Sequence, residues 1–177
     1  PPYAEYKAES IIAILRSVLA SSAADAVLFC VQMHGYLLAD AEGKLLTNYI
    51  SWQDERAGIA GVSFEPEARH GVAAKNNLPR SGVLAMEKLC PDVARRARQF
   101  FTLGSYIGRV FAGSNVTHIT DAAASGFYDA VTCRADESPL LLPEARKDIS
   151  VIGKYGNKLI YTPAGDQQTA VYGTIGF

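Results

Sequence analysis

The feature that most constrains this sequence is a short apolar run, Ala26–Val31, which directly follows a segment with helical periodicity. Apolar side chains recur within residues 5–20 at the spacing of an amphipathic helix. The run that follows shows no alternation of apolar and polar residues, which is typical of a strand buried on both faces. A helix followed by a buried strand is the repeating unit of an α/β domain, so we expect this fold class.

The rest of the chain predicts further helices and hairpins. Gly43 can adopt the positive φ of a tight turn, and two apolar stretches beside it predict a β-hairpin of residues 36–39 and 44–47. Residues 57–80 have little periodicity and are expected to be irregular, with one short helix. The remaining predicted elements are helices at 81–89, 91–100, 102–112 and 166–175, and strands at 150–152 and 159–161.

The composition argues against several classes of protein. Seventeen basic and eighteen acidic residues give a net charge of −1, so we expect neither nucleic acid nor a membrane as a partner. The histidines, at positions 34, 70 and 118, have no zinc-site spacing, and no metal ligands are predicted. Three widely spaced cysteines indicate a reducing, cytoplasmic compartment, and Cys30 within the apolar run is expected to be buried.

Four short segments combine polar side chains with apolar surroundings. They are Gln32–Gly35, Trp52–Arg56, Thr120–Gly126 and Gly165–Gln168. The first follows the predicted buried strand, and ligands of open α/β sheets bind just beyond the carboxyl ends of strands. Each segment also has a purely structural interpretation, as a packed histidine or tryptophan, a surface ion pair of Asp54 with Arg56, or helix caps at Asp121 and Asp166.

Taken together, these segments resemble the FGGY family of carbohydrate kinases. Gln32-Met33-His34-Gly35, a hairpin, and then Trp52-Gln53-Asp54 are similar to the sugar-binding stretch of xylulose kinases. The Asp121 to Gly126 segment resembles the middle motif of the family. Gly165-Asp166-Gln167, followed by a helix of small residues, resembles the motif that holds the catalytic aspartate.

The resemblance implies an α/β fold of the actin-like, ribonuclease-H-like ATPase type, and a reaction in which ATP, with Mg²⁺, phosphorylates a small-molecule sugar. A xylulose-like ketose is the first choice of substrate, with sedoheptulose, gluconate, ribulose and glycerol as alternatives. A homodimer is left open. The residues carried over are the catalytic base Asp166 and the sugar-binding residues Met33, His34, Trp52, Asp54 and Gln167.

By the same resemblance, residues 1–177 correspond to an incomplete N-terminal, sugar-binding domain. Family members begin with a strand and an Asp-x-Gly-Thr phosphate loop and continue into a nucleotide-binding domain. Neither is recognisable here, so we expect the chain alone to lack a complete ATP site. Two other hypotheses stay open: a non-catalytic sugar-binding or regulatory module, and an α/β domain whose short motifs match by chance.

Overall fold

Helices and short strands alternate along the chain in the computed structural model, which describes residues 3–175. The strands are β1 (Glu5–Tyr6), β2 (Ala26–Val27), β3 (Cys30–Val31), β4 (Leu37–Ala39), β5 (Tyr49–Ile50), β6 (Gln99–Phe101), β7 (Val116–His118), β8 (Glu144–Arg146), β9 (Val151–Tyr155), β10 (Lys158–Tyr161) and β11 (Ala164–Gly165). The helices are α1 (Ala8–Ser21), α2 (Arg56–Ala60), η1 (Ala68–His70, a 3₁₀ turn), α3 (Pro79–Leu89), α4 (Pro91–Arg96), α5 (Leu103–Ala112), α6 (Ile119–Ala123) and α7 (Asp166–Ile175).

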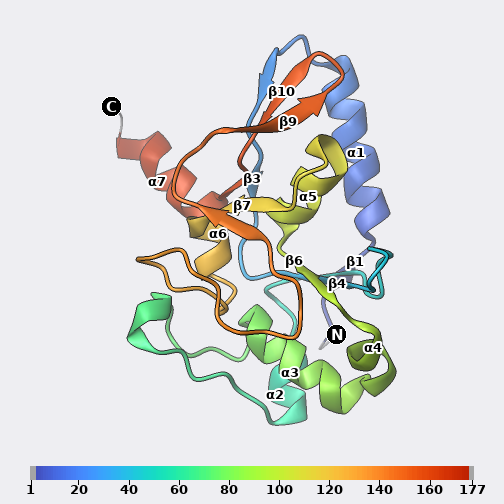
Figure 1. Ribbon diagram of the computed structural model, residues 1–177, viewed down its shortest axis with the longest axis vertical. Coiled ribbons are helices and arrows are strands. Elements are labelled where there is room, and N and C mark those ends of the chain that lie inside the picture. The colour runs from blue at the N-terminus through green and yellow to red at the C-terminus, as the bar shows by residue number, and fades with distance from the viewer. Residues whose placement is uncertain (1–2, 176–177) are drawn as a thin grey trace.

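The molecule has two halves of different character (Figure 1). The upper half holds β2, β9 and β10, with α1 and α5 beside them, and α7 extends from its left side. Within this half, β10 pairs in parallel with β2 and antiparallel with β9. The lower half contains α2, α3 and α4 together with the long irregular connection that runs between α2 and α3.

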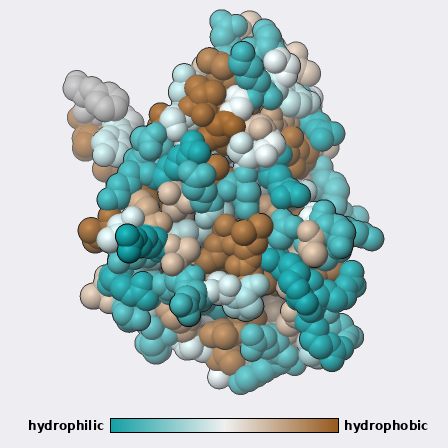
Figure 2. All heavy atoms as spheres, in the orientation of Figure 1, coloured by the Kyte–Doolittle hydropathy of each residue, from teal (hydrophilic) through white to brown (hydrophobic). Residues whose placement is uncertain are grey.

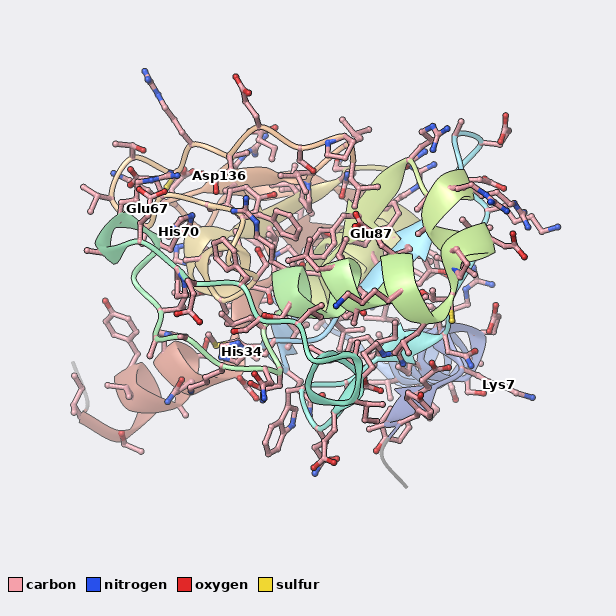
Figure 3. The ribbon with its side chains drawn as sticks, turned by 90° about the horizontal axis from the view of Figure 1, so that it is seen from below. Lys7, His34, Glu67, His70, Glu87 and Asp136 are labelled. Carbon is pink, nitrogen blue, oxygen red and sulfur yellow. The ribbon has the colours of Figure 1, made fainter. Side chains whose placement is uncertain are left out.

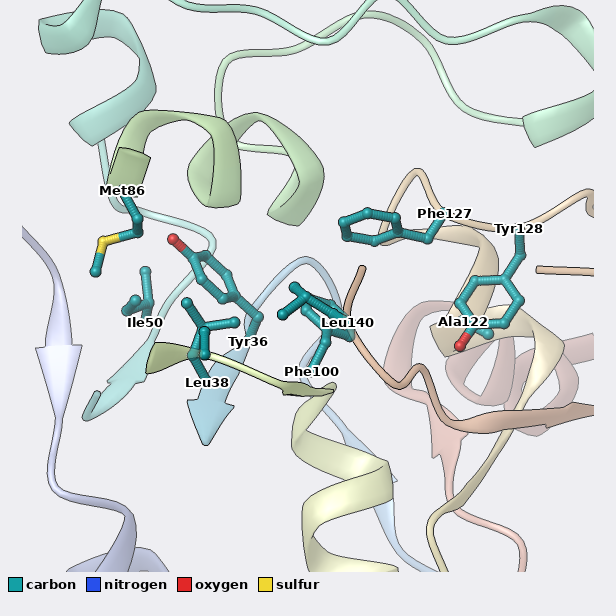
Figure 4. Packing of buried hydrophobic residues seen from close by; sticks show 10 residues of the cluster. Tyr36, Leu38, Ile50, Met86, Phe100, Ala122, Phe127, Tyr128 and Leu140 are labelled. Carbon is teal, nitrogen blue, oxygen red and sulfur yellow. The ribbon is translucent and has the colours of Figure 1, made fainter. Parts of the chain in front are cut away.

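Each half has its own apolar core. In the upper half, Phe29 and Val31 pack with Phe111 of α5 and Ile160 of β10. In the lower half, Tyr36 stacks on Phe100 with a ring-centroid distance of 6.0 Å. Figure 4 shows the lower cluster, whose buried members are Tyr36, Leu38, Ile50, Met86, Ala97, Phe100, Ala122, Phe127, Tyr128 and Leu140.

The predicted strand 26–31 is present but broken, and it is not buried on both faces. β2 pairs with β10 and β3 pairs with β11, so the segment changes partner at Leu28 and Phe29. Val27, Phe29 and Val31 pack against the apolar core, whereas Cys30 is exposed. The prediction of a buried Cys30 is therefore wrong, because a strand in this position has only one face against the α1 and α5 layer.

Three predicted boundaries are also wrong. The helix predicted over 91–100 ends at Arg96, since Gln99–Phe101 pairs with β4 as strand β6. The first helix begins at Ala8, because Glu5–Tyr6 pairs with β5. The turn at Gly43 is confirmed with φ = 82°, but residues 44–47 form only an isolated bridge to β4.

The other elements are confirmed. The helix expected over 102–112 begins after Thr102, whose side chain accepts a hydrogen bond from the Ser105 backbone N–H, and it ends at Gly113 with φ = 70°. Pro79 and Pro91 each begin a helix, a position where a missing backbone N–H costs nothing. The stretch 57–80 is largely irregular, as expected, but it contains most of α2, the 3₁₀ turn η1 and the first two residues of α3 where one short helix was expected.

Figure 2 shows a largely hydrophilic face with a hydrophobic patch near its middle and further hydrophobic groups toward its top and bottom. Among residues 3–175, no helix is both long enough and apolar enough to cross a membrane.

Candidate functional site

Two adjacent parallel strands end at the same edge, and predicted site residues follow each of them. β11 pairs in parallel with β3, with Gly165 opposite Val31. The chain continues from β3 to Met33 and His34, and from β11 into Asp166 at the start of α7. Because parallel strands present their carboxyl ends to one edge, His34 and Asp166 lie near one another, and the Asp166 carboxylate acts on the pKa of His34. We call β3, β11 and the first turn of α7 the back wall.

His34 is held in a conformation suited to accept a hydrogen bond. Its φ is 61°, in the left-handed region that non-glycine residues rarely adopt. Burial of the imidazole, followed by the charge of Lys75, lowers the pKa of His34 below its ordinary 6.5, so the ring is neutral at pH 7. Within residues 3–175, the buried Nδ1 atom has no hydrogen-bond partner. An unpaired acceptor of this kind can take a hydrogen bond from a water or from a ligand hydroxyl.

Gly165 is required by the close approach of Met33. A Cβ atom at position 165 would lie 2.7 Å from the Met33 Sδ atom, far inside van der Waals contact. The Gly165 N–H donates to Thr120 Oγ1 at 3.0 Å, and the Thr169 hydroxyl donates to the Gly165 carbonyl at 2.8 Å. The Gly-Asp pair therefore fixes the strand end from which Asp166 projects.

A hollow of about 410 Å³ lies against the back wall. We call it the histidine hollow. The Gln168 Oε1 atom is buried at this site and, like His34 Nδ1, has no hydrogen-bond partner among the described residues. The lining residues are Met33, His34, Gly71, Val72, Ala73, Lys75, Ile119, Thr120, Ala123, Ala124, Ala130, Gln167 and Gln168.

Trp52 and Asp54 lie in a second hollow of about 730 Å³, here called the tryptophan hollow. Trp52 is 43% exposed, so it is not a core residue. The other residues that line the tryptophan hollow are Gln53, Glu55, Gly58, Ile59, Asn76 and Asn77. A cavity of about 10 Å³ is bordered by His34, Asp54, Asn76 and Asn77 and lies between the two hollows.

The predicted site residues therefore divide between neighbouring hollows. Met33, His34 and Gln167 line the histidine hollow, while Trp52 and Asp54 line the tryptophan hollow. Asp166 is exposed at the edge of the back wall. The two hollows have no lining residue in common, but the small cavity shares His34 with the histidine hollow and Asp54, Asn76 and Asn77 with the tryptophan hollow.

Asp54 and Arg56 form a buried pair and not the surface ion pair of the structural interpretation. Asp54 Oδ1 accepts from Arg56 Nε at 2.6 Å and Oδ2 accepts from Arg56 Nη2 at 2.9 Å. Both side chains are about 5% exposed or less, and Glu5 accepts a further bond from Arg56 at 2.6 Å. The Ala4 N–H also donates to Asp54. A pair of this kind orients the 52–56 segment, and both carboxylate oxygens of Asp54 already accept hydrogen bonds from the protein.

Asp121 is buried behind the site. Its Oδ2 accepts from the Thr117 hydroxyl at 2.8 Å. Burial raises the pKa of this carboxyl to about 6, and the charge of Asp166 acts in the same direction. Asp121 lies in the first turn of α6, and its bond with Thr117 connects this helix to β7.

Sequence reasoning assigned no role to three polar lining residues of one loop, Lys75, Asn76 and Asn77, nor to Gln168 within the candidate segment Gly165–Gln168. Lys75 to Asn77 form a polar run within an irregular connection. Loops positioned by a rigid scaffold often carry binding residues, and this signal could have identified them. Gln168 follows Asp166 and Gln167 directly, and only its unpaired oxygen singles it out.

Comparison with known proteins identifies the family. The N-terminal domain of the FGGY family of carbohydrate kinases matches residues 5–142. Asp166 and Gln167 therefore lie beyond the matched region. None of the curated protein sequences matches this chain significantly.

Several solved structures share the fold. A ligand-bound xylulose kinase from Lactobacillus acidophilus has a TM-score of 0.82 and 20% identity, over 96% of this chain and 41% of that one. A gluconate kinase from the same organism has a TM-score of 0.80 and 20% identity, over 93% and 40%. A Plasmodium falciparum glycerol kinase with ADP has a TM-score of 0.70 and 18% identity, over 96% and 42%.

This chain thus spans about two fifths of the length of those structures. The similarity confirms the expected α/β, actin-like and ribonuclease-H-like fold. Because the family's domain matches most of its length, this chain belongs to the FGGY family of carbohydrate kinases.

Proposed function

We propose that this protein transfers the γ-phosphoryl group of ATP to a hydroxyl of a sugar, with a xylulose-like ketose as the first choice. The observation that carries the proposal is the placement of His34 and Asp166 at the ends of two paired parallel strands, beside a hollow with unpaired acceptor atoms. The similarity to a xylulose kinase supports the choice of sugar. Residues 1–177 form the sugar-binding unit in this proposal.

Asp166 is the proposed base. As the sugar oxygen attacks the γ-phosphorus, a new oxygen–phosphorus bond forms and the bond to the bridging oxygen of ADP breaks. The hydroxyl proton passes to the Asp166 carboxylate, which is exposed at the edge of the back wall and free to meet a substrate. General base catalysis of this kind contributes about 10²–10⁴-fold in rate. Phosphoryl transfer otherwise depends on positioning and charge stabilisation.

The remaining residues position the sugar. Neutral His34 presents Nδ1 as an acceptor for a sugar hydroxyl, and Gln167 lies beside the base. Met33 and Trp52 supply apolar surface on the two sides, a combination that suits the carbon face of a sugar. Asp54 holds the segment that carries Trp52 through its pair with Arg56.

ATP enters this proposal as the second substrate, accompanied by Mg²⁺. Mg²⁺ usually binds one or two carboxylates together with substrate phosphates and water. Within residues 3–175, no three His, Cys, Asp or Glu side chains form a cluster that could hold a metal ion. We therefore assign no protein cage to Mg²⁺. Its chemistry here would be to neutralise phosphate charge.

A sugar acid is a second candidate substrate, because Lys75 lines the histidine hollow. Lys75 is the only charged residue among the side chains that line this hollow, if His34 is neutral. Within the described residues, its ammonium group makes no hydrogen bond or ion pair, and it lowers the pKa of His34. A carboxylate on the substrate would pair with it, and the similarity to a gluconate kinase points in the same direction.

Sugar-dependent ADP release by the intact protein tests the proposal. The panel should contain xylulose, ribulose, sedoheptulose, glycerol and gluconate. We expect the highest kcat/KM with xylulose, and a preference for gluconate would select the second candidate. Sugar binding in calorimetry without ADP release would support a non-catalytic module, and neither binding nor release with any member of the panel would contradict the proposal.

A further inference from the structure

A cluster of charged side chains outside both hollows centres on Asp136. Its Oδ1 accepts from Arg69 Nη1 at 2.7 Å, and its Oδ2 accepts from His70 Nε2 at 2.9 Å. Arg80 Nη1 donates to the same Oδ2 atom. The Asp136 side chain is 8% exposed and that of His70 is 1% exposed. Figure 3 shows Glu67, His70 and Asp136 gathered on one side of the molecule, apart from His34.

The partners of Asp136 are themselves held in place. His70 Nδ1 bonds the Glu67 backbone N–H at 3.0 Å, and its ring meets Phe64 edge-on at 5.3 Å. The guanidinium of Arg80 lies 4.1 Å from the centre of the Phe64 ring. Burial opposes ionisation of Asp136, but bonds from His70, Arg69 and Arg80 outweigh it and lower the pKa of Asp136 to about 2. The carboxylate is therefore charged at any physiological pH.

These contacts fall on both sides of one loop. Arg69 and His70 lie immediately before residues 71–78, and Arg80 lies two residues after them, as the second residue of α3. One carboxylate thus joins the two ends of this segment, which we call the 71–78 loop. Restraining the ends of a loop removes conformations that it could otherwise adopt.

The 71–78 loop supplies one side of both hollows. Its residues 71–73 and Lys75 line the histidine hollow, while Asn76 and Asn77 line the tryptophan hollow. Asn77 Nδ2 donates to the Trp52 carbonyl at 2.7 Å, which connects the loop to the predicted apolar wall. The loop contains no helix or strand, so its position depends on the bonds at its ends together with a few contacts of its own, such as that of the Lys75 carbonyl with the Ser81 hydroxyl.

We propose that Asp136 is a positioning residue for sugar binding, because it clamps both ends of the loop that closes the two hollows. Asp136 touches no part of the hollows itself. This inference rests on the proposed function, since the loop positions a sugar only if the hollows bind one. Loss of the clamp leaves Arg69, His70 and Arg80 facing each other without the carboxylate, and the loop ends separate.

The test is the Asp136→Asn variant of the intact protein, with Glu137→Gln as the matched control. Glu137 is the adjacent exposed acidic residue, so its substitution removes the same charge without touching the loop. We expect Asp136→Asn to raise the sugar KM at least about tenfold while kcat changes less than about threefold, the pattern of lost ground-state positioning. Hydrogen exchange should accelerate within residues 71–78, and Glu137→Gln should change neither quantity.

Arg69→Gln provides a milder variant if Asp136→Asn folds poorly. The Arg69 side chain is 41% exposed, and its loss removes only one of the three bonds to Asp136. A smaller rise in KM in the same direction is expected. An unchanged KM in both variants would overturn the inference, as would faster exchange spread evenly over the chain. If the wild-type protein shows no sugar-dependent activity, the proposed function fails, and exchange within 71–78 still decides whether the clamp exists.

Discussion

The back wall and the 71–78 loop face the same hollows but are held by different forces. The strands of the back wall are paired, and Phe29 and Val31 pack in an apolar core with Ile160 and Phe111. The loop has no paired strand. Its flanking residues bond to Asp136, the Asn77 side chain and the Lys75 carbonyl make further hydrogen bonds, and only Leu78 at its end is a buried apolar residue. Apolar packing is nearly independent of pH and salt, whereas the loop depends on charges.

This difference separates two tasks. A base must stay within a fraction of an ångström of its working position, and a site on packed elements achieves this. A binding loop can open to admit substrate, and segments with few apolar contacts are the first to open locally. Asp166 on the back wall is therefore expected to govern rate, and the loop side to govern sugar affinity.

The largest expected effect is on the stability of the back wall. Ile160 is completely buried in the upper core. Its replacement by Ala removes three methyl or methylene groups and leaves a cavity, at a cost of about 2–5 kcal/mol. Urea denaturation measures the change. Val131→Ala, at a position that is 71% exposed, serves as the control and should stay within about 0.5 kcal/mol of wild type. If Ile160→Ala lowers the free energy of unfolding by less than about 1 kcal/mol, apolar packing is not what holds the back wall.

The Asp121→Asn variant tests the ionisation of Asp121, whose side chain is buried behind the back wall. The pKa of Asp121 is raised from 3.8 to about 6, so the folded state binds more protons than the unfolded state between those pH values. The stability contributed by this group therefore falls as pH rises through that window. Asp121→Asn should gain stability relative to wild type by about 1.4 kcal/mol for each unit of pKa shift.

The measurement for Asp121→Asn is urea denaturation of both proteins across the acidic range. The difference between them should be smallest near the ordinary pKa of an aspartate and largest near neutral pH. A difference that does not depend on pH would show that Asp121 ionises as it does in water.

Trp52→Ala has the smallest expected effect on stability. It tests whether the loop side of the site governs sugar affinity. Because Trp52 is 43% exposed, its removal should cost less than about 1.5 kcal/mol of stability. Sugar KM should rise about tenfold as the apolar wall is lost, with kcat nearly unchanged. Steady-state kinetics measures both values, and a change in kcat without a change in KM would assign Trp52 to catalysis instead.

The sequence predicts those parts of the molecule that depend on local pattern. The helix at 166–175 follows from the Gly-Asp pair that opens it, and the position of His34 after a strand follows from the apolar run before it and the rule on strand ends. Gln99–Phe101 shows the limit: it was expected to continue a helix, but pairing with β4 makes it a strand. Such a choice depends on a partner about 60 positions earlier in the chain, which local propensity does not contain.

The same limit explains what was missed in the site. Asp136 contacts residues that are 56 to 67 positions away, so no spacing in the sequence reveals the clamp. The pairing of Asp54 with Arg56 is visible in the sequence, but its burial depends on contacts with Glu5 and Tyr3, about 50 positions earlier in the chain. The family resemblance supplied roles for Asp166 and Trp52, which lie in separate parts of the site and which local pattern alone would treat as a cap and a core residue.

We propose above that Asp166 on the back wall takes the hydroxyl proton from a sugar bound in the hollows. The most direct measurement is the kinetics of Asp166→Asn in the intact protein at saturating sugar and ATP, together with sugar binding by calorimetry. We expect kcat to fall by at least about 100-fold while sugar affinity stays within about threefold of wild type. An Asp166→Asn enzyme that retains wild-type turnover would contradict the account.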